Sequence, residues 1–125
     1  MKNLVLALLL SFSGVSYGLA MDFVDPPVEW EFTEFNFAVI EQGKPVEVIF
    51  RVTNDNEGPL VIKNVKTSCG CTASDYSKEP ILPGATSEIK ATYNAAKLGK
   101  FTKTIRVYTN QSDEPVVLTI RGEVK

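Results

Sequence analysis

The chain has 125 residues and a formal net charge of −2, so at most one ordinary domain is expected. This charge gives no basic surface of the kind that binds nucleic acid, and nucleic acid is therefore not expected as a main partner. The chain contains no histidine. It therefore lacks the commonest general base, the commonest metal ligand and the usual partner of a Ser or Cys nucleophile, so we expect neither an enzyme nor a cofactor.

Residues 1–20 have the pattern of a secretory signal peptide. Lys2 supplies a positive end, an apolar run follows at Leu4–Leu10, and small residues at Gly18 and Ala20 suit cleavage. The apolar run is too short to span a bilayer. We therefore expect export to the periplasm, the cell surface or the medium, with no transmembrane segment in the mature chain.

Residues 21–29 contain Pro26-Pro27 and are predicted to form an extended lead-in. The first strand follows over Trp30–Phe37. Its alternation of apolar and polar residues slips at Thr33-Glu34, which predicts either a bulge or a strand that switches between two sheets.

The clearest strand is Val46–Thr53, where every second residue is apolar. The segment Asn54–Pro59 after it is rich in turn formers. Its oxygen-bearing side chains lack the spacing and the final bidentate glutamate of a calcium loop. A plain turn is the prediction.

Further strands are predicted at Leu60–Lys66, Glu88–Tyr93, Phe101–Thr109 and Val116–Val124. Pro83-Gly84 predicts a type II turn, and residues 94–99 predict a connection or one short helical turn. Turn signals at short intervals and the absence of helical periodicity indicate an all-β fold. We predict an immunoglobulin-like antiparallel β-sandwich of about seven strands over residues 30–125, with the aromatic residues in its core or on its sheet faces.

The two cysteines, Cys69 and Cys71, are the central feature of the mature chain, in the run Thr67-Ser68-Cys69-Gly70-Cys71-Thr72. In a regular strand their Cα atoms would lie about 6.6 Å apart, at the outer limit for a disulfide. Gly70 would allow the backbone to shorten this distance.

Four interpretations of this pair remain open. An oxidising compartment favours a local disulfide or a packed pair. A thiol-exchange site would need activation by Lys63, Lys66 or Lys78, the nearby cations in the sequence. Two sulfurs would accept Cu(I) but provide only half of a zinc site, and no metal site is predicted. The thiols could also form bonds between chains.

The cysteine run and its surroundings resemble a known bacterial family, the domain of unknown function family 1573. The resemblance rests on runs that together extend from about Trp30 to Val124: Asn64–Thr72, Tyr76–Ile81, Pro83-Gly84, Gly99-Lys100-Phe101 with Lys103, Tyr108-Thr109-Asn110 and Leu118–Val124. The Ser68–Thr72 core with the downstream Pro-Gly is its most specific part. One departure is Phe37-Ala38, where the family usually has Phe-Gly and where alanine would tolerate a positive φ poorly.

The resemblance implies an immunoglobulin-like fold related to domains of ciliary and sperm-protein-like assemblies, whose members mostly bind other proteins, and it implies no assigned activity. The leading hypothesis is an exported module that accepts an extended partner segment at a sheet edge, either at Trp30–Phe37 or at the cysteine segment. The alternative is a thiol-disulfide protein that uses Cys69 and Cys71. Asn110-Gln111-Ser112 matches a glycosylation sequon, which has little weight in a bacterial chain.

Overall fold

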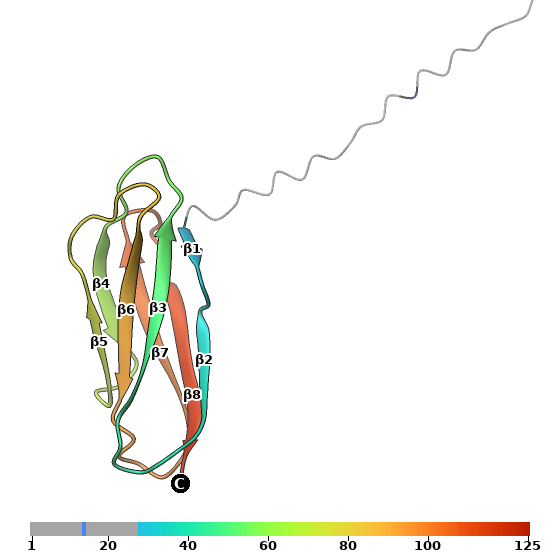
Figure 1. Cartoon of the computed structure of the whole chain (residues 1–125), viewed down its shortest axis with the longest axis vertical. Helices are drawn as coiled ribbons and strands as arrows, with labels where there is room; N and C mark the ends of the chain where they lie inside the picture. Colours follow the sequence, from blue (N-terminus) through green and yellow to red (C-terminus); the bar gives the residue numbers. More distant parts are fainter. Residues whose placement is uncertain (1–13, 15–27) are drawn as a thin grey trace, which may run out of the picture.

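The protein is a sandwich of two four-stranded sheets in a computed structural model that describes Gly14 and residues 28–125 (Figure 1). The expected signal peptide, and residues 21–27 of the expected lead-in, lie outside the described residues. The strands are β1 (Val28–Trp30), β2 (Glu34–Ile40), β3 (Val46–Asn54), β4 (Ile62–Thr67), β5 (Thr72–Tyr76), β6 (Thr86–Tyr93), β7 (Gly99–Thr109) and β8 (Val116–Val124). No helix occurs in the described residues, and so none that could cross a membrane.

One sheet has the order β1-β3-β6-β5 and the other has the order β2-β8-β7-β4. The predicted all-β sandwich is confirmed. The first predicted strand does switch between sheets: β1 pairs with β3 in one sheet and β2 pairs with β8 in the other. The predicted all-antiparallel arrangement is wrong at this one place, because β2 runs parallel to β8 after the switch.

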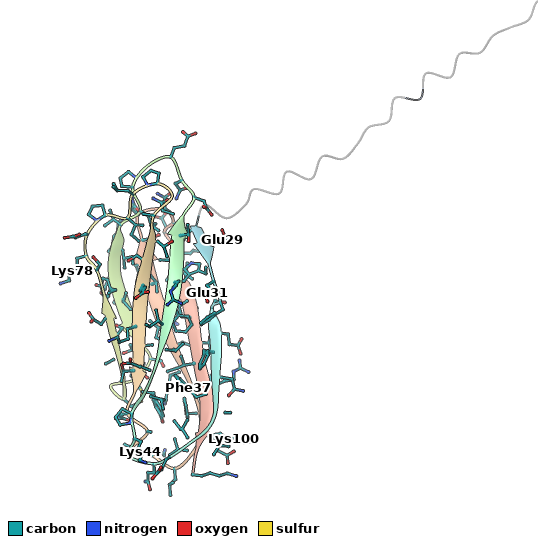
Figure 2. All side chains as sticks on the ribbon, in the orientation of Figure 1. Glu29, Glu31, Phe37, Lys44, Lys78 and Lys100 are labelled. Atoms are coloured by element: carbon teal, nitrogen blue, oxygen red, sulfur yellow. A yellow bond between two sulfur atoms is a disulfide. The ribbon has the colours of Figure 1, made fainter. Side chains whose placement is uncertain are left out.

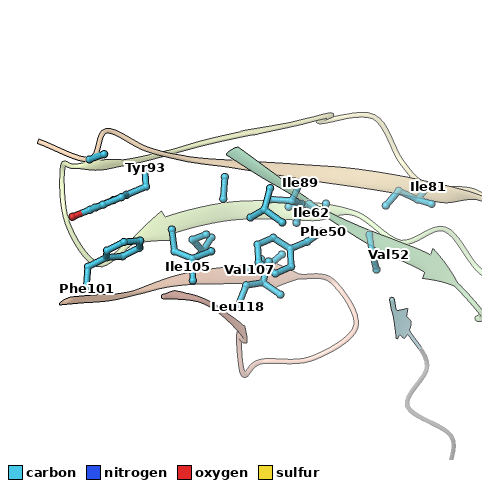
Figure 3. Close-up of a cluster of buried hydrophobic side chains, with 14 of the residues drawn as sticks. Phe50, Val52, Ile62, Ile81, Ile89, Tyr93, Phe101, Ile105, Val107 and Leu118 are labelled. Atoms are coloured by element: carbon cyan, nitrogen blue, oxygen red, sulfur yellow. The ribbon is translucent and has the colours of Figure 1, made fainter. Parts of the chain in front are cut away.

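The core lies between the sheets and is built from alternate residues of the central strands, as the two-residue period of a strand requires (Figure 3). Phe50, Ile89, Ile105, Leu118 and Ile120 are fully buried. Aromatic residues of the switching strand extend this core, since Phe32 contacts Phe50 edge-on with ring centroids 5.5 Å apart. The predicted core role of these aromatic residues is confirmed.

β5 was not predicted. Its residues Thr72, Ala73, Ser74, Asp75 and Tyr76 have low average β-propensity and little apolar alternation. It forms because the cysteine turn directs the chain from β4 into the other sheet, where β5 pairs regularly with β6.

Candidate functional site

The cysteine pair lies in the turn that connects β4, at the edge of one sheet, with β5, at the edge of the other (Figure 1). The structure places the two sulfur atoms at disulfide distance, with Cα atoms 5.3 Å apart. This distance is shorter than the spacing of a regular strand, because the pair lies in a turn. The Thr72 N–H donates to the Cys69 carbonyl (3.3 Å), which closes a turn over residues 69–72 and brings the cysteines together.

The residues that flank the pair hold this turn against the rest of the sandwich. The Thr67 hydroxyl donates to the Cys69 carbonyl (3.1 Å). The Ser68 hydroxyl accepts the Thr104 N–H (3.0 Å), and the Ser68 N–H donates to the Thr104 carbonyl (2.9 Å). Thr72 is buried, so the Ser-Cys-Gly-Cys-Thr run is anchored at both ends.

The two sulfur atoms have different surroundings. The Cys69 Sγ accepts the Cys71 N–H at 3.3 Å and lies 3.8 Å from the Thr72 Oγ1. The Cys71 side chain instead packs against the buried apolar cluster. Cys69 therefore has polar neighbours and Cys71 has apolar ones.

A basic groove of about 280 Å³ adjoins the turn. It is lined by Lys66, Thr67 and Ser68 from β4 and its end, and by Thr104 and Arg106 from β7. Lys66 and Arg106 are partners in the register of β4 and β7. Arg106 was missed in the sequence because only this long-range pairing brings it beside the cysteine segment.

The three lysines named from the sequence separate in the structure. Lys66 lines the groove, whereas Lys63 lies near the start of β4. Lys78 follows β5 and lies at the opposite end of that strand from the turn (Figure 2). Among the described residues, no cluster of three potential metal ligands occurs, and nothing in the structure adds a ligand to the cysteine pair.

Asn54, within the segment predicted to be a plain turn, is a fully buried polar residue. Its Nδ2 donates to the carbonyls of Gly58 (2.9 Å) and Ile81 (2.8 Å), and its Oδ1 accepts the Asn56 N–H (3.0 Å). Asn110, the sequon residue, donates its Nδ2 to the Pro59 carbonyl (3.0 Å) and accepts the Val61 N–H (2.8 Å). Both asparagines therefore hold loops.

Solved structures share the fold at low identity. A protein of unknown function from Porphyromonas gingivalis W83 has a TM-score of 0.68 and 16% identity, covering 77% of this chain and 46% of that one. The ASH / PapD-like domain of human CEP192 has a TM-score of 0.64 and 8% identity, covering 79% and 85%. The Vibrio cholerae VesB protease has a TM-score of 0.63 and 12% identity, covering 79% and 32%.

These comparisons show the fold alone, and the chain spans under half the length of the Porphyromonas protein. A comparison with curated proteins finds no significant relative. A family model described as "Protein of unknown function (DUF1573)" matches residues 28–124, which is every described strand. The chain therefore belongs to this family, in which no biochemical activity is assigned.

Proposed function

We propose that this chain is an exported protein-binding module that accepts an extended segment of a partner protein at the free edge of β5. The observation that carries the proposal is that β5 is a regular edge strand. It pairs with β6 over Thr72–Tyr76 without a register shift and ends the order of its sheet. An unpaired backbone edge of this kind is the template that strand addition uses.

The hydrogen-bond pattern shows which groups of β5 face outward. The Asn94 N–H donates to the Cys71 carbonyl (3.0 Å), so residues 71, 73 and 75 direct their backbone groups toward β6. By the same alternation, Ser74 and Tyr76 direct their N–H and C=O groups away from the sheet. These groups are available to an added strand.

The other sheet edges are blunted. In β2 a register shift separates Asn36 from Val39, and the Asn36 Oδ1 accepts the Ala38 N–H (2.8 Å). In β4 a shift follows Ile62, and the Asn64 Oδ1 accepts the Val65 N–H (2.9 Å). β1 has only three residues. Bulges and side-chain caps are among the usual protections of an edge against pairing, and the five-residue β5 has neither.

Export is part of this proposal. The pattern of residues 1–20 favours a signal peptide that is removed, with residues 21–29 as a lead-in to the sandwich. A cysteine pair at disulfide distance suits an oxidising compartment such as the periplasm or the cell surface. Intact mass measurement of protein exported by a bacterial host would test the cleavage site.

The binding proposal is tested with a phage-displayed library of unstructured peptides. Selected peptides are titrated into the wild type, Ser74→Pro and Ser74→Val. Proline removes the outward N–H of Ser74, which β6 does not use, whereas valine keeps it. We expect about tenfold weaker binding to Ser74→Pro than to Ser74→Val, and slowed hydrogen exchange at the amides of Ser74 and Tyr76.

Circular dichroism and the thermal midpoint check that both variants fold. Equal binding to the two variants, protection that maps to β2 or β4, or failure to select any peptide would each overturn the proposal.

A further inference from the structure

The local bond between Cys69 and Cys71 is a weak stabiliser, because it closes a very short loop. The entropy that a disulfide removes from the unfolded chain falls with the length of the loop it closes, and this loop is near the minimum. The surrounding turn already has its own hydrogen bonds through Thr67, Ser68 and Thr72. Stabilisation of the fold is therefore a poor explanation for a cysteine pair at this position.

Gly70 is a second feature that the fold does not explain. Gly84 has φ = +78°, which favours glycine, and a Cβ on Gly122 would lie 2.8 Å from the Phe101 ring, so the fold gives a reason for glycine at both positions. At Gly70 the φ is not positive, and apart from the adjacent residues Cys69 and Cys71 a Cβ would meet nothing within 4 Å. Because residue 70 is a glycine, it adds no side chain of its own beside the two sulfurs.

We propose that Cys69 and Cys71 form a thiol-disulfide exchange site, with Cys69 as the exchanging sulfur and Cys71 as the resolving sulfur. The N–H of Cys71 (3.3 Å) and the hydroxyl of Thr72 (3.8 Å) are both placed to donate to a Cys69 thiolate. Donors to the charged form favour it. Cys71, packed against apolar side chains, favours the neutral thiol.

The reaction balances without any further reagent. In the reduced protein the Cys69 thiolate attacks one sulfur of a substrate disulfide, forms a mixed disulfide and releases the other sulfur as a thiolate, which takes up a proton. Cys71 then loses its proton and attacks the Cys69 Sγ, which forms the Cys69–Cys71 bond and releases the second substrate thiol. The substrate disulfide is reduced to a dithiol and the protein dithiol is oxidised, and the reverse reaction oxidises a substrate dithiol.

The basic groove selects the substrate class. Lys66 and Arg106 line it together with Ser68, the residue that precedes Cys69. Their positive charges favour an anionic thiol or disulfide over a cationic one of similar size. The inference does not depend on binding at β5, although β5 begins at Thr72, directly after the pair.

The test uses single-cysteine variants of the exported chain and two small disulfides of opposite charge. Cys71→Ser retains Cys69, and Cys69→Ser retains Cys71. Each is treated with glutathione disulfide, which is anionic, and with cystamine, which is cationic, and the mixed disulfide is followed by mass spectrometry. We expect Cys71→Ser to react about tenfold faster than Cys69→Ser near pH 7, because hydrogen-bond donors lie beside the Cys69 sulfur whereas apolar side chains surround Cys71.

Two sets of control variants test the groups near Cys69, namely the Thr72 hydroxyl and the positive charge of Lys66. Thr72→Val removes the hydroxyl near the Cys69 sulfur while it keeps the side-chain shape, and Thr72→Ser restores the hydroxyl. In the Cys71→Ser background, the pH midpoint of Cys69 alkylation should rise with Val and return with Ser. Lys66→Gln should reduce the preference for glutathione disulfide over cystamine.

Equal reactivity of the two single-cysteine variants, or faster reaction of Cys71, would overturn the assignment. So would a wild-type disulfide that dithiothreitol does not reduce in the folded protein. Because these probes are small and lack an extended backbone, failure here leaves the β5 proposal intact. Loss of peptide binding in Ser74→Pro with unchanged exchange rates would show that the two sites act independently.

Discussion

The two ends of the sandwich are held by different kinds of interaction. At the end toward which β3 runs (Figure 1), Asn54 and Asn110 bind loop backbone through side-chain amides. At the opposite end, Tyr93 stacks on Phe101 with ring centroids 4.0 Å apart (Figure 3). Phe101 also covers its cross-strand partner Gly122. The cysteine turn lies at this second end.

The difference shows which end depends on buried polar groups. A buried amide with satisfied partners gives a loop one conformation, and its removal leaves the partners unpaired. Aromatic packing holds strands together without specifying the loops between them. The cysteine turn lies at the aromatic end, where Cys71 packs against the core and Thr72 is buried.

The largest loss of stability is expected at the end of the sandwich that contains Asn54. Asn54→Ala should lower the free energy of unfolding by about 3 kcal/mol, because the carbonyls of Gly58 and Ile81 and the Asn56 N–H lose their partner in a buried site. Chemical denaturation measures this loss. Asn110→Ala is the matched control, since its exposed partners can bind water, and its loss should be about 1 kcal/mol. Equal losses would show that burial does not matter here.

At the aromatic end, Gly122→Ala should cost about 2 kcal/mol. The new Cβ would lie 2.8 Å from the Phe101 ring and 3.1 Å from the Ala38 carbonyl, so the ring must shift from its stack on Tyr93. Thermal unfolding would report the loss. Adding Phe101→Leu to Gly122→Ala should cost less than Phe101→Leu costs in the wild type, and simple additivity would contradict this account.

Substitutions in the cysteine turn are expected to change the free energy of unfolding less than those at Asn54 or Gly122. Replacement of both cysteines by serine is expected to cost at most about 1.6 kcal/mol, the chain-entropy value for this short loop. Urea denaturation of the variant beside the oxidised wild type measures it. A loss of about 4 kcal/mol would mean that the bond is a structural staple.

The smallest expected change is an increase in stability. Ala38 has φ = +61° in the bulge of β2, so Ala38→Gly should stabilise the protein by about 1 kcal/mol by relieving backbone strain. Ala95 has a similar φ of +54° but is fully buried, so Ala95→Gly loses core contacts that offset the gain. Differential scanning calorimetry of the two variants separates strain from packing. Destabilisation by Ala38→Gly would contradict the strain at this position.

The departure from the family pattern at Phe37-Ala38 is one feature that the sequence identified correctly. The position where the resembled family has glycine does adopt a positive φ, with alanine in place. The strand ends of Val46–Asn54 and Val116–Val124 were also close to those predicted, because strict alternation identifies a half-buried strand. β5 and the burial of Asn54 could not be predicted, since neither has an apolar pattern of its own.

The sequence by itself determined the all-β class, the family and the prominence of Cys69 and Cys71, because alternation, turn residues and a short motif are local properties of the chain. Only the tertiary structure decided that Arg106 joins Lys66 beside the cysteine turn, that Asn54 is buried, and that β5 is the regular free edge. These features depend on the register between strands distant in sequence. Such pairing is set by the packing of two sheets around one core, and no local pattern specifies it.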